Sequence, residues 1–290
     1  MVSQAEKNQE YEKKGYLNSD YRMFYLEENE EKEFQNHYHD FDKIIIFLKG
    51  HVCYTIEGKS YDLLENDIVL IRHGDVHKVQ ISKDTPYERI IMYLSPVYLD
   101  NFNKNDFSLG NCFLMAKEKY SNVIRFSNIN NNTLIKIAMQ IKESLESKQN
   151  EESEELLRET LLIQFMIFLE RSIKSGFGSY VDTDHCNRKI VEIIQFINHN
   201  LTEELNIDFL ANYFYLTKYH MMRQFKKETG YTIGNYITNK RLMYAKELIK
   251  RGEPITKVCF ECGFKEHSTF NRAYKQLYGV TPVKSREEDI

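Results

Sequence analysis

The sequence predicts an α+β chain of several domains, with an antiparallel β-barrel in its N-terminal part and an all-α domain in its C-terminal part. Three observations support this prediction. Short β-branched and aromatic runs separated by glycine turns fill residues 21–99. Helical periodicity begins only at about residue 133. The C-terminal third then contains a helix-turn-helix pattern twice, at an offset of 49 residues.

The predicted strands follow one another at short intervals. Turns such as Glu57-Gly58-Lys59 and His73-Gly74-Asp75 separate them. Because no helical pattern interrupts the series, a parallel β-α-β sheet is excluded and a sandwich or barrel is favoured. The predicted strand runs are residues 44–48, 52–56, 60–64, 67–71, 76–81 and 87–94.

Two helices are expected between the barrel and the C-terminal domain. Apolar residues recur at helical spacing over residues 133–147, and a longer helix with an acidic first turn follows over residues 151–174. The wide apolar stripe of the longer helix suits packing within its own domain and contact with a second copy of the chain equally well. The predicted organisation is a polar arm (1–20), a barrel (21–127), a helical packing or dimerisation segment (128–174), a linker (175–187) and a helical domain (188–290), with helix-turn-helix units at about 205–230 and 254–279.

Composition limits the functional classes. Of 290 residues, 42% are hydrophobic and 28% are charged, as in globular proteins. The first twenty residues contain no apolar signal segment, and the most apolar stretch, residues 161–169, is too short to cross a bilayer. Five scattered cysteines indicate a reducing compartment, and we interpret the Cys259/Cys262 pair as buried apolar residues. We therefore expect a cytoplasmic protein without a membrane partner.

Charge is divided unevenly along the chain. The whole sequence has 39 Lys or Arg and 43 Asp or Glu, a formal net charge of −4. Residues 186–290 contain 17 basic and 12 acidic residues, a net charge of +5, which leaves −9 on the remainder. A basic segment in an otherwise acidic chain indicates that this segment binds nucleic acid.

Each copy of the repeat ends a basic amphipathic helix with a glycine. Arg223–Thr232 resembles Arg272–Thr281, with Arg, Lys, Gly and Thr recurring in place. Each copy follows a short helix and a tight turn, and the second helix of such a unit enters the major groove of DNA with its first residues at the base edges. The candidate DNA-contacting residues are Lys218, Tyr219, His220, Met222 and Arg223 in the first unit, and Glu266, His267, Ser268, Thr269 and Arg272 in the second.

Residues 188–286 resemble the DNA-binding domain of the AraC/XylS family of bacterial transcription regulators. The resemblance rests on Ile255–Phe264, Ser268–Arg272 and Tyr278–Pro282. It implies two helix-turn-helix units joined by a long helix at about residues 233–250. The positions that it places at or near DNA are Arg223 and Arg272, then Tyr219, Met222, His267 and Thr269, and Arg241 in the linking helix, which either supports the domain or contacts the DNA backbone.

The same resemblance implies the partners. They are double-stranded promoter DNA, RNA polymerase, and a second copy of this chain bound through the helix of residues 151–174. Two residues depart from the family pattern. Cys259 replaces the usual alanine, and Tyr215 lies at a turn position where glycine is frequent. We therefore expect the first turn to be less regular than the second.

Histidines are concentrated in the predicted barrel, with five of the nine in residues 37–77. His37 and His39 are two residues apart on a predicted strand, which places both imidazoles on one face. This segment resembles a cupin barrel, or jelly roll, the sensor domain of many family members. In the cupin metal pattern a glutamate follows the histidine pair, whereas this chain has Lys43, a cation that would oppose a metal if it pointed inward. We therefore expect no metal and no cofactor, with His37, His39 and His77 as the remaining candidates for zinc or iron.

A small organic effector is expected in the barrel mouth, by resemblance to the cupin fold. Arg89 and Tyr93 share one face of a predicted strand. Arginine suits a carboxylate, and tyrosine and histidine suit hydroxyl groups. The alternative for Arg89 is an ion pair with an acidic neighbour such as Glu88 or Asp84. The candidate ligand-binding residues are His37, His39, Tyr54, His77, Arg89 and Tyr93.

The sequence thus predicts a DNA-binding transcription regulator whose barrel senses a sugar or a small organic acid and thereby changes promoter binding. An enzyme is not expected, because the chain has no nucleophile elbow, phosphate loop or paired acid–base motif. Two alternatives remain open. One is a metal-dependent cupin enzyme with a basic helical appendage, and the other is a regulator without a ligand that is switched by partner association.

Overall fold

The computed structural model describes residue 17 and residues 19–29, 32–82, 85–104, 107–127, 133–147, 152–183 and 185–288. Most of the predicted polar arm, and Asp84, lie outside these ranges. The chain forms two compact units. The first contains Met1–Ile56 and Ser60–Thr183, and the second contains Asp184–Ile290 together with Glu57–Lys59.

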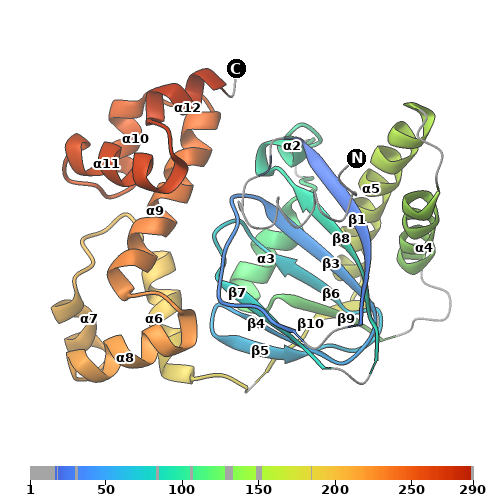
Figure 1. Cartoon of the computed structure of the whole chain (residues 1–290), viewed down its shortest axis with the longest axis horizontal. Coiled ribbons are helices and arrows are strands. Elements are labelled where there is room, and N and C mark those ends of the chain that lie inside the picture. The colour runs from blue at the N-terminus through green and yellow to red at the C-terminus, as the bar shows by residue number, and fades with distance from the viewer. Residues whose placement is uncertain are drawn as a thin grey trace. The chain divides into compact units, whose positions relative to one another are not determined.

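Two antiparallel sheets form the first unit (Figure 1). The larger sheet has the strand order β1-β8-β3-β6-β9-β10 and the smaller sheet the order β2-β7-β4-β5. The predicted antiparallel barrel is confirmed. The strands are β1 (Tyr21–Glu28), β2 (Lys32–Glu33), β3 (Asp42–Lys49), β4 (Val52–Ile56), β5 (Lys59–Asp62), β6 (Ile68–Ile71), β7 (His77–Ile81), β8 (Tyr87–Leu94), β9 (Val123–Phe126) and β10 (Gly178–Tyr180).

Each face of the larger sheet buries a separate core. Ile44 and Met92 pack against helices on one face, while their neighbours Ile45 and Ile91 lie between the two sheets. Successive side chains of a strand point to opposite faces, so β3 and β8 supply both cores and have continuous apolar runs at their centres. In Figure 1, α4 and α5 lie side by side on the helix-covered face. The helices of this unit are α2 (Pro96–Asp100), α3 (Asn111–Lys119), α4 (Thr133–Glu146) and α5 (Glu152–Lys174).

One segment differs from its prediction. Residues 175–187, expected as a linker, contain β10, which pairs with β9 and extends the larger sheet. Local composition misled the prediction, because a glycine-rich strand of three residues is typical of a turn. The packing explains the glycine: a Cβ atom on Gly178 would lie 2.9 Å from Cε1 of Phe126.

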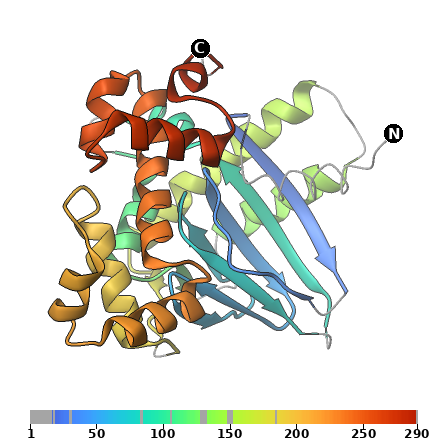
Figure 2. The same ribbon diagram turned by 60° about the vertical axis from the view of Figure 1, so that its left-hand side comes forward.

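The described part of residues 188–288 is entirely helical, and α9 runs between two helix pairs (Figures 1 and 2). Tyr236, near the start of α9, packs edge-on against Phe225 of the first pair. Leu242 and Ile249 pack with Phe270 of the second pair. The predicted all-α domain with two helix-turn-helix units is confirmed. Its helices are α6 (Arg188–His199), α7 (Ile207–Tyr213), α8 (Lys218–Thr229), α9 (Ile233–Lys250), α10 (Ile255–Glu261), α11 (His267–Tyr278) and α12 (Pro282–Glu288).

The Cys259/Cys262 pair lies in the core around α10. Both residues are buried among apolar side chains of α9 and α11. Burial raises the pKa of Cys262 to about 12, so its thiol stays protonated near neutral pH. None of the described helices combines the length and apolarity needed to cross a bilayer.

Candidate nucleic-acid interface and ligand site

The helix α8 has one buried face and one exposed face. Met221, Phe225 and Thr229 recur every four residues and are buried, which fixes the orientation of the helix. Thr217 caps its N-terminus, where the hydroxyl accepts a hydrogen bond from the backbone N–H of His220. The other face carries the five residues predicted to contact DNA, all of them exposed: Lys218, Tyr219, His220, Met222 and Arg223. Lys218 also pairs with Asp208 of α7.

The helix α11 repeats this arrangement. Phe270 and Tyr274 are fully buried, and the exposed residues predicted to contact DNA are Glu266, at its N-cap, Ser268, Thr269 and Arg272. His267 is the exception, because it is half-buried and its ring lies edge-on to Phe260, with the centroids 5.0 Å apart.

One exposed residue of α11 was not selected from the sequence. Asn271 lies beside Arg272 on the solvent-facing side of the helix. The 49-residue offset between the two repeats pairs Asn271 with Met222, which was selected. The repeat in the sequence was therefore sufficient to identify Asn271 as a candidate DNA contact.

Arg223 and Arg272 occupy the same position in the two helices and are both exposed. Neither guanidinium forms an ion pair with a residue that the structure describes. The exposed ammonium groups of Lys226, Lys227 and Lys275 lie further along the two helices. Each helix thus presents polar side chains at its start and positive charge after them. This arrangement suits DNA, whose phosphates are negatively charged and whose base edges carry hydrogen-bonding groups.

Arg241 differs from the DNA contact that the resemblance allowed. Its guanidinium donates hydrogen bonds to three backbone carbonyls, those of Leu201 at 2.8 Å, Glu203 at 2.6 Å and Gly263 at 2.8 Å. These bonds join α9 to the loop after α6 and to the turn of the second unit. The side chain is therefore a structural clamp, and the sequence could not show this because the three acceptors are backbone atoms.

The two helix-turn-helix turns have the same backbone geometry. Tyr215 has a φ of +54° where Gly263 has +79°. Leu216 N–H then donates to the carbonyl of Ala211 at 2.9 Å, and an equivalent bond of 3.1 Å closes the second turn. The expected irregularity of the first turn is therefore wrong. A tyrosine that is 94% exposed adopts a left-handed conformation that usually favours glycine.

The contacts of the six residues proposed for ligand binding in the barrel fall into two groups. Arg89 and Tyr93 are buried and share one face of β8. They are four residues apart along the strand, or about 13 Å. Tyr54 lies near Arg89, whereas the three histidines lie near Tyr93.

In the first group, which contains Arg89 and Tyr54, other residues of the protein already bind the guanidinium of Arg89. Its Nη2 lies 3.2 Å from Oε1 of Glu28, and its guanidinium carbon lies 4.0 Å from the ring centre of Tyr87. The Tyr87 hydroxyl in turn lies 3.1 Å from the hydroxyl of Tyr54. The ion pair considered as an alternative is thus present, but with Glu28 of β1 instead of Glu88, which points to the opposite face of β8.

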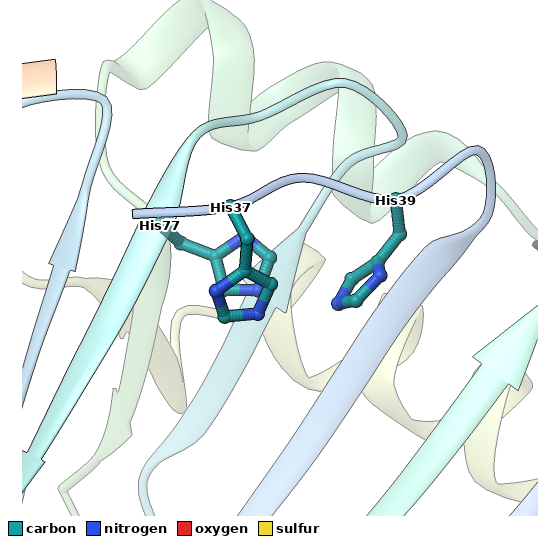
Figure 3. A group of neighbouring side chains, drawn as sticks. All are labelled: His37, His39 and His77. Atoms are coloured by element: carbon teal, nitrogen blue, oxygen red, sulfur yellow. The ribbon is translucent and has the colours of Figure 1, made fainter. Parts of the chain in front are cut away.

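The second group contains His37, His39 and His77, whose side chains lie close together (Figure 3). His37 and His77 form an isolated bridge in which each backbone N–H donates to the carbonyl of the other, at 3.0 and 2.8 Å. His39 is two residues further along an extended segment that precedes β3, not on the regular strand that was predicted. The ring centroids lie 4.3 to 5.1 Å apart.

Some ring nitrogens of these histidines form hydrogen bonds, and others are buried without a hydrogen-bond partner. His37 Nδ1 and His77 Nδ1 donate to the carbonyls of Gln35 and Asp75, at 2.8 and 2.9 Å. Both ring nitrogens of His39, and Nε2 of His77, are buried without a hydrogen-bond partner among the described residues. An unpaired buried donor or acceptor costs about 1–3 kcal/mol.

Burial and neighbouring positive charge disfavour the protonated forms of His39 and His77. Burial first, and then the charge of Lys43, lower the pKa of His39 well below its usual value. For His77 burial again lowers the pKa most, followed by His37, His39 and Lys43. Lys43 is 6% exposed, with its ammonium 5.5 Å from the ring centre of Tyr93. The lysine that replaces the cupin glutamate therefore points inward.

Two protein families match the two parts of this chain. Residues 21–166 match the model of the AraC-like ligand binding domain, and residues 210–288 match that of a helix-turn-helix domain. The HTH-type transcriptional activator RhaS of Enterobacter sp. (strain 638) is 24% identical over 257 residues, which cover 88% of each chain. RhaS of Escherichia coli (strain SMS-3-5 / SECEC) is 23% identical over 261 residues, also 88% of each chain. The solved structure of ToxT from Vibrio cholerae is 15% identical and covers 93% of this chain and 99% of its own, with a TM-score of 0.37.

Proposed function

The chain belongs to the AraC family of transcription regulators, and we propose that its α8 and α11 helices bind one promoter DNA in successive major-groove segments. The AraC-like ligand-binding domain senses a small molecule, and the helix-turn-helix domain binds DNA. One observation carries the proposal for the two helices. Arg223 and Arg272 are exposed at the same position of two helices whose opposite faces are buried.

The length of α9 supports simultaneous binding. An α-helix rises 1.5 Å per residue, so the 18 residues of α9 span about 27 Å. Successive major-groove segments on one face of DNA are one helical turn apart, about 34 Å. Because α9 packs against both helix pairs, it acts as a spacer of suitable length.

The proposed contacts follow from exposure and chemistry. Arg223 and Arg272 present a planar fork of donors that matches the edge of guanine. The lysines 226, 227 and 275 neutralise phosphates. Arg241 is not among the proposed contacts, because its donors are engaged within the domain. The proposed groove-facing residues are Lys218, Tyr219, His220, Met222 and Arg223, and Glu266, Ser268, Thr269, Asn271 and Arg272.

An unbiased DNA selection with the purified full chain tests this proposal. We expect a consensus with two half-sites about 10 base pairs apart, and binding that weakens steeply with salt. A repeat of the selection with candidate sugars and small organic acids reports coupling to an effector. Enrichment of no sequence, or equal binding to random DNA, would contradict the proposal.

RNA polymerase and a second copy of the chain are the other partners in this proposal. We infer that the chain acts in the cytoplasm without enzymatic activity and contacts RNA polymerase. The name of its relative RhaS, a transcriptional activator, supports the role of activator. Self-association through α5 is supported by two exposed leucines near its start, Leu156 at 65% and Leu157 at 45% exposure. We expect a Leu156→Ser/Leu157→Ser variant to be monomeric by light scattering. A mass equal to that of the parent protein would remove α5 as the interface.

A further inference from the structure

We propose that His37, His39 and His77 form a binding site for one divalent transition-metal ion, in addition to the DNA and effector functions above. The three side chains each offer one ring nitrogen, and these nitrogens lie within 4.8 Å of one another. In Figure 3 the three imidazoles gather on one side of their backbone segments. Imidazole is a preferred ligand of zinc, copper, nickel and iron.

The backbone holds the three ligands in place. The reciprocal hydrogen bonds between His37 and His77 set these residues directly opposite each other, with both side chains on the same face. His39 follows two residues later, so it points to that face as well. The site is therefore assembled from two segments that the sheet pairing already fixes.

The second ring nitrogen of two of the histidines is fixed as well. A carbonyl oxygen can only accept, so Gln35 and Asp75 place the proton of His37 and of His77 on Nδ1. The nitrogen of each ring that is left to bind a metal is then Nε2. Metal-binding histidines characteristically donate their other N–H to a carbonyl or a carboxylate in this way.

The unpaired nitrogens provide a second, independent observation. Both nitrogens of His39 and Nε2 of His77 are buried and have no hydrogen-bond partner among the residues that the structure describes. Buried polar atoms are rarely left unpaired in native proteins. A bound cation would satisfy His77 Nε2 and one nitrogen of His39 at once.

The distances require only a small adjustment. Three nitrogens at about 2.1 Å from a tetrahedral zinc ion are about 3.4 Å apart. The observed limit of 4.8 Å therefore closes by about 1.4 Å at most, which rotations of the side chains provide. Three histidines also leave at least one coordination position open.

Lys43 determines which ligand suits the open position. Its buried ammonium contributes positive charge to the same interior and would repel a bare cation. An anionic oxygen ligand on the metal offsets part of this repulsion, because its negative charge attracts both the metal and the ammonium. We therefore assign the open position to a carboxylate or a similar oxygen anion.

Metal titration of the full chain, without an affinity tag and after treatment with a chelator, tests the site. We expect one Zn²⁺ per chain by calorimetry and by elemental analysis after dialysis, and a visible Co²⁺ spectrum of low symmetry. The variants His39→Leu and His77→Leu should lower the Zn²⁺ affinity by at least about 10- to 100-fold. The matched control is His51→Ala, an exposed histidine outside the cluster, which should bind like the parent protein.

The His39→Leu variant is chosen so that it folds. Leucine keeps the apolar bulk beside Phe41 and removes two unpaired buried nitrogens. We expect its metal-free form to unfold at the same temperature as the parent protein or higher. Zn²⁺ should raise the unfolding temperature of the parent protein and not that of the variant.

Two results would overturn the proposal. One is a parent protein that retains no metal above the level of a folded His39→Leu variant. The other is loss of Zn²⁺ binding in His51→Ala, which would show adventitious surface binding. Both measurements are made without DNA, so their failure is distinct from failure of the DNA-binding proposal.

Discussion

Arginine residues of the helical domain illustrate how the same side chain serves two purposes. Arg241 directs its donors to three backbone carbonyls, whereas Arg272 is exposed on α11 and Arg223 on α8. Residue type and local sequence do not show whether an arginine binds within the domain or remains exposed. The separation comes from which acceptors the tertiary structure brings within reach of each guanidinium.

Arg272→Ala is predicted to weaken binding of the selected DNA site by about 1–3 kcal/mol, the value of one bidentate base contact. Fluorescence anisotropy at several salt concentrations measures the loss. Arg251→Ala is the control, because Arg251 is exposed at the end of α9 and pairs with Glu247. A smaller loss together with a reduced salt slope would identify Arg272 as a phosphate contact.

Arg241→Ala is predicted to destabilise the helical domain by about 1.5–3 kcal/mol for each charged hydrogen bond that is left unsatisfied and buried. Urea unfolding followed by circular dichroism measures this change. Arg241→Lys should not restore stability, because a lysine cannot reach three carbonyls with a planar fork. If Arg241→Ala were as stable as the parent protein and bound DNA less well, Arg241 would be a direct contact.

At the scale of elements, the two helix-turn-helix units are built alike from different residues. Both turns use a residue of positive φ followed by the same type of backbone hydrogen bond. In the second unit glycine is also required by packing, because a Cβ on Gly263 would lie 2.8 Å from the carbonyl oxygen of Thr202. Tyr215 has solvent around it and meets only the backbone requirement.

Tyr215→Gly is therefore predicted to stabilise the first unit. Relief of the left-handed strain, about 1–2 kcal/mol, exceeds the entropic cost of glycine, about 0.5–1 kcal/mol. Slower amide hydrogen exchange in α7 and α8 of the full chain would show the gain. Gly263→Ala provides the contrast, with faster exchange in α10 and α11. Equal or faster exchange in Tyr215→Gly would mean that the exposed tyrosine side chain stabilises the turn.

At the scale of the whole molecule, charge is divided between the two functions. The helix-turn-helix segment, residues 186–290, is +5, and the rest of the chain is −9. We expect the acidic part of the chain to lower the affinity of the protein for DNA in general, because like charges repel. Specific contacts are then required for tight binding.

The separate segment 186–290 is predicted to bind random DNA more tightly than the full chain at low salt. Anisotropy titrations of both proteins across salt concentrations measure this difference. It should shrink as salt rises, since screening removes the repulsion from the acidic part. Equal affinities at low salt would contradict this role for the acidic charge.

Local patterns in the sequence were sufficient for many elements of this fold. Strands β3 to β8, the turn at Glu57 and Gly58, the helices α4 and α5, and both helix-turn-helix units follow from periodicity, turn residues and the repeat. These signals depend on residues a few positions apart, which a sequence displays directly. The exposed faces of α8 and α11 follow as well, because helical spacing separates buried from exposed positions.

Contacts between residues far apart in the chain came from the three-dimensional fold. It added β10 to the sheet, paired Arg89 with Glu28, engaged Arg241 with three carbonyls, and gathered the three histidines together. These contacts join segments far apart in the chain, and their partners include backbone atoms that every residue type carries. The sequence by itself thus determined the domains and their DNA-facing helices, whereas long-range packing decided which polar side chains remain available for a ligand.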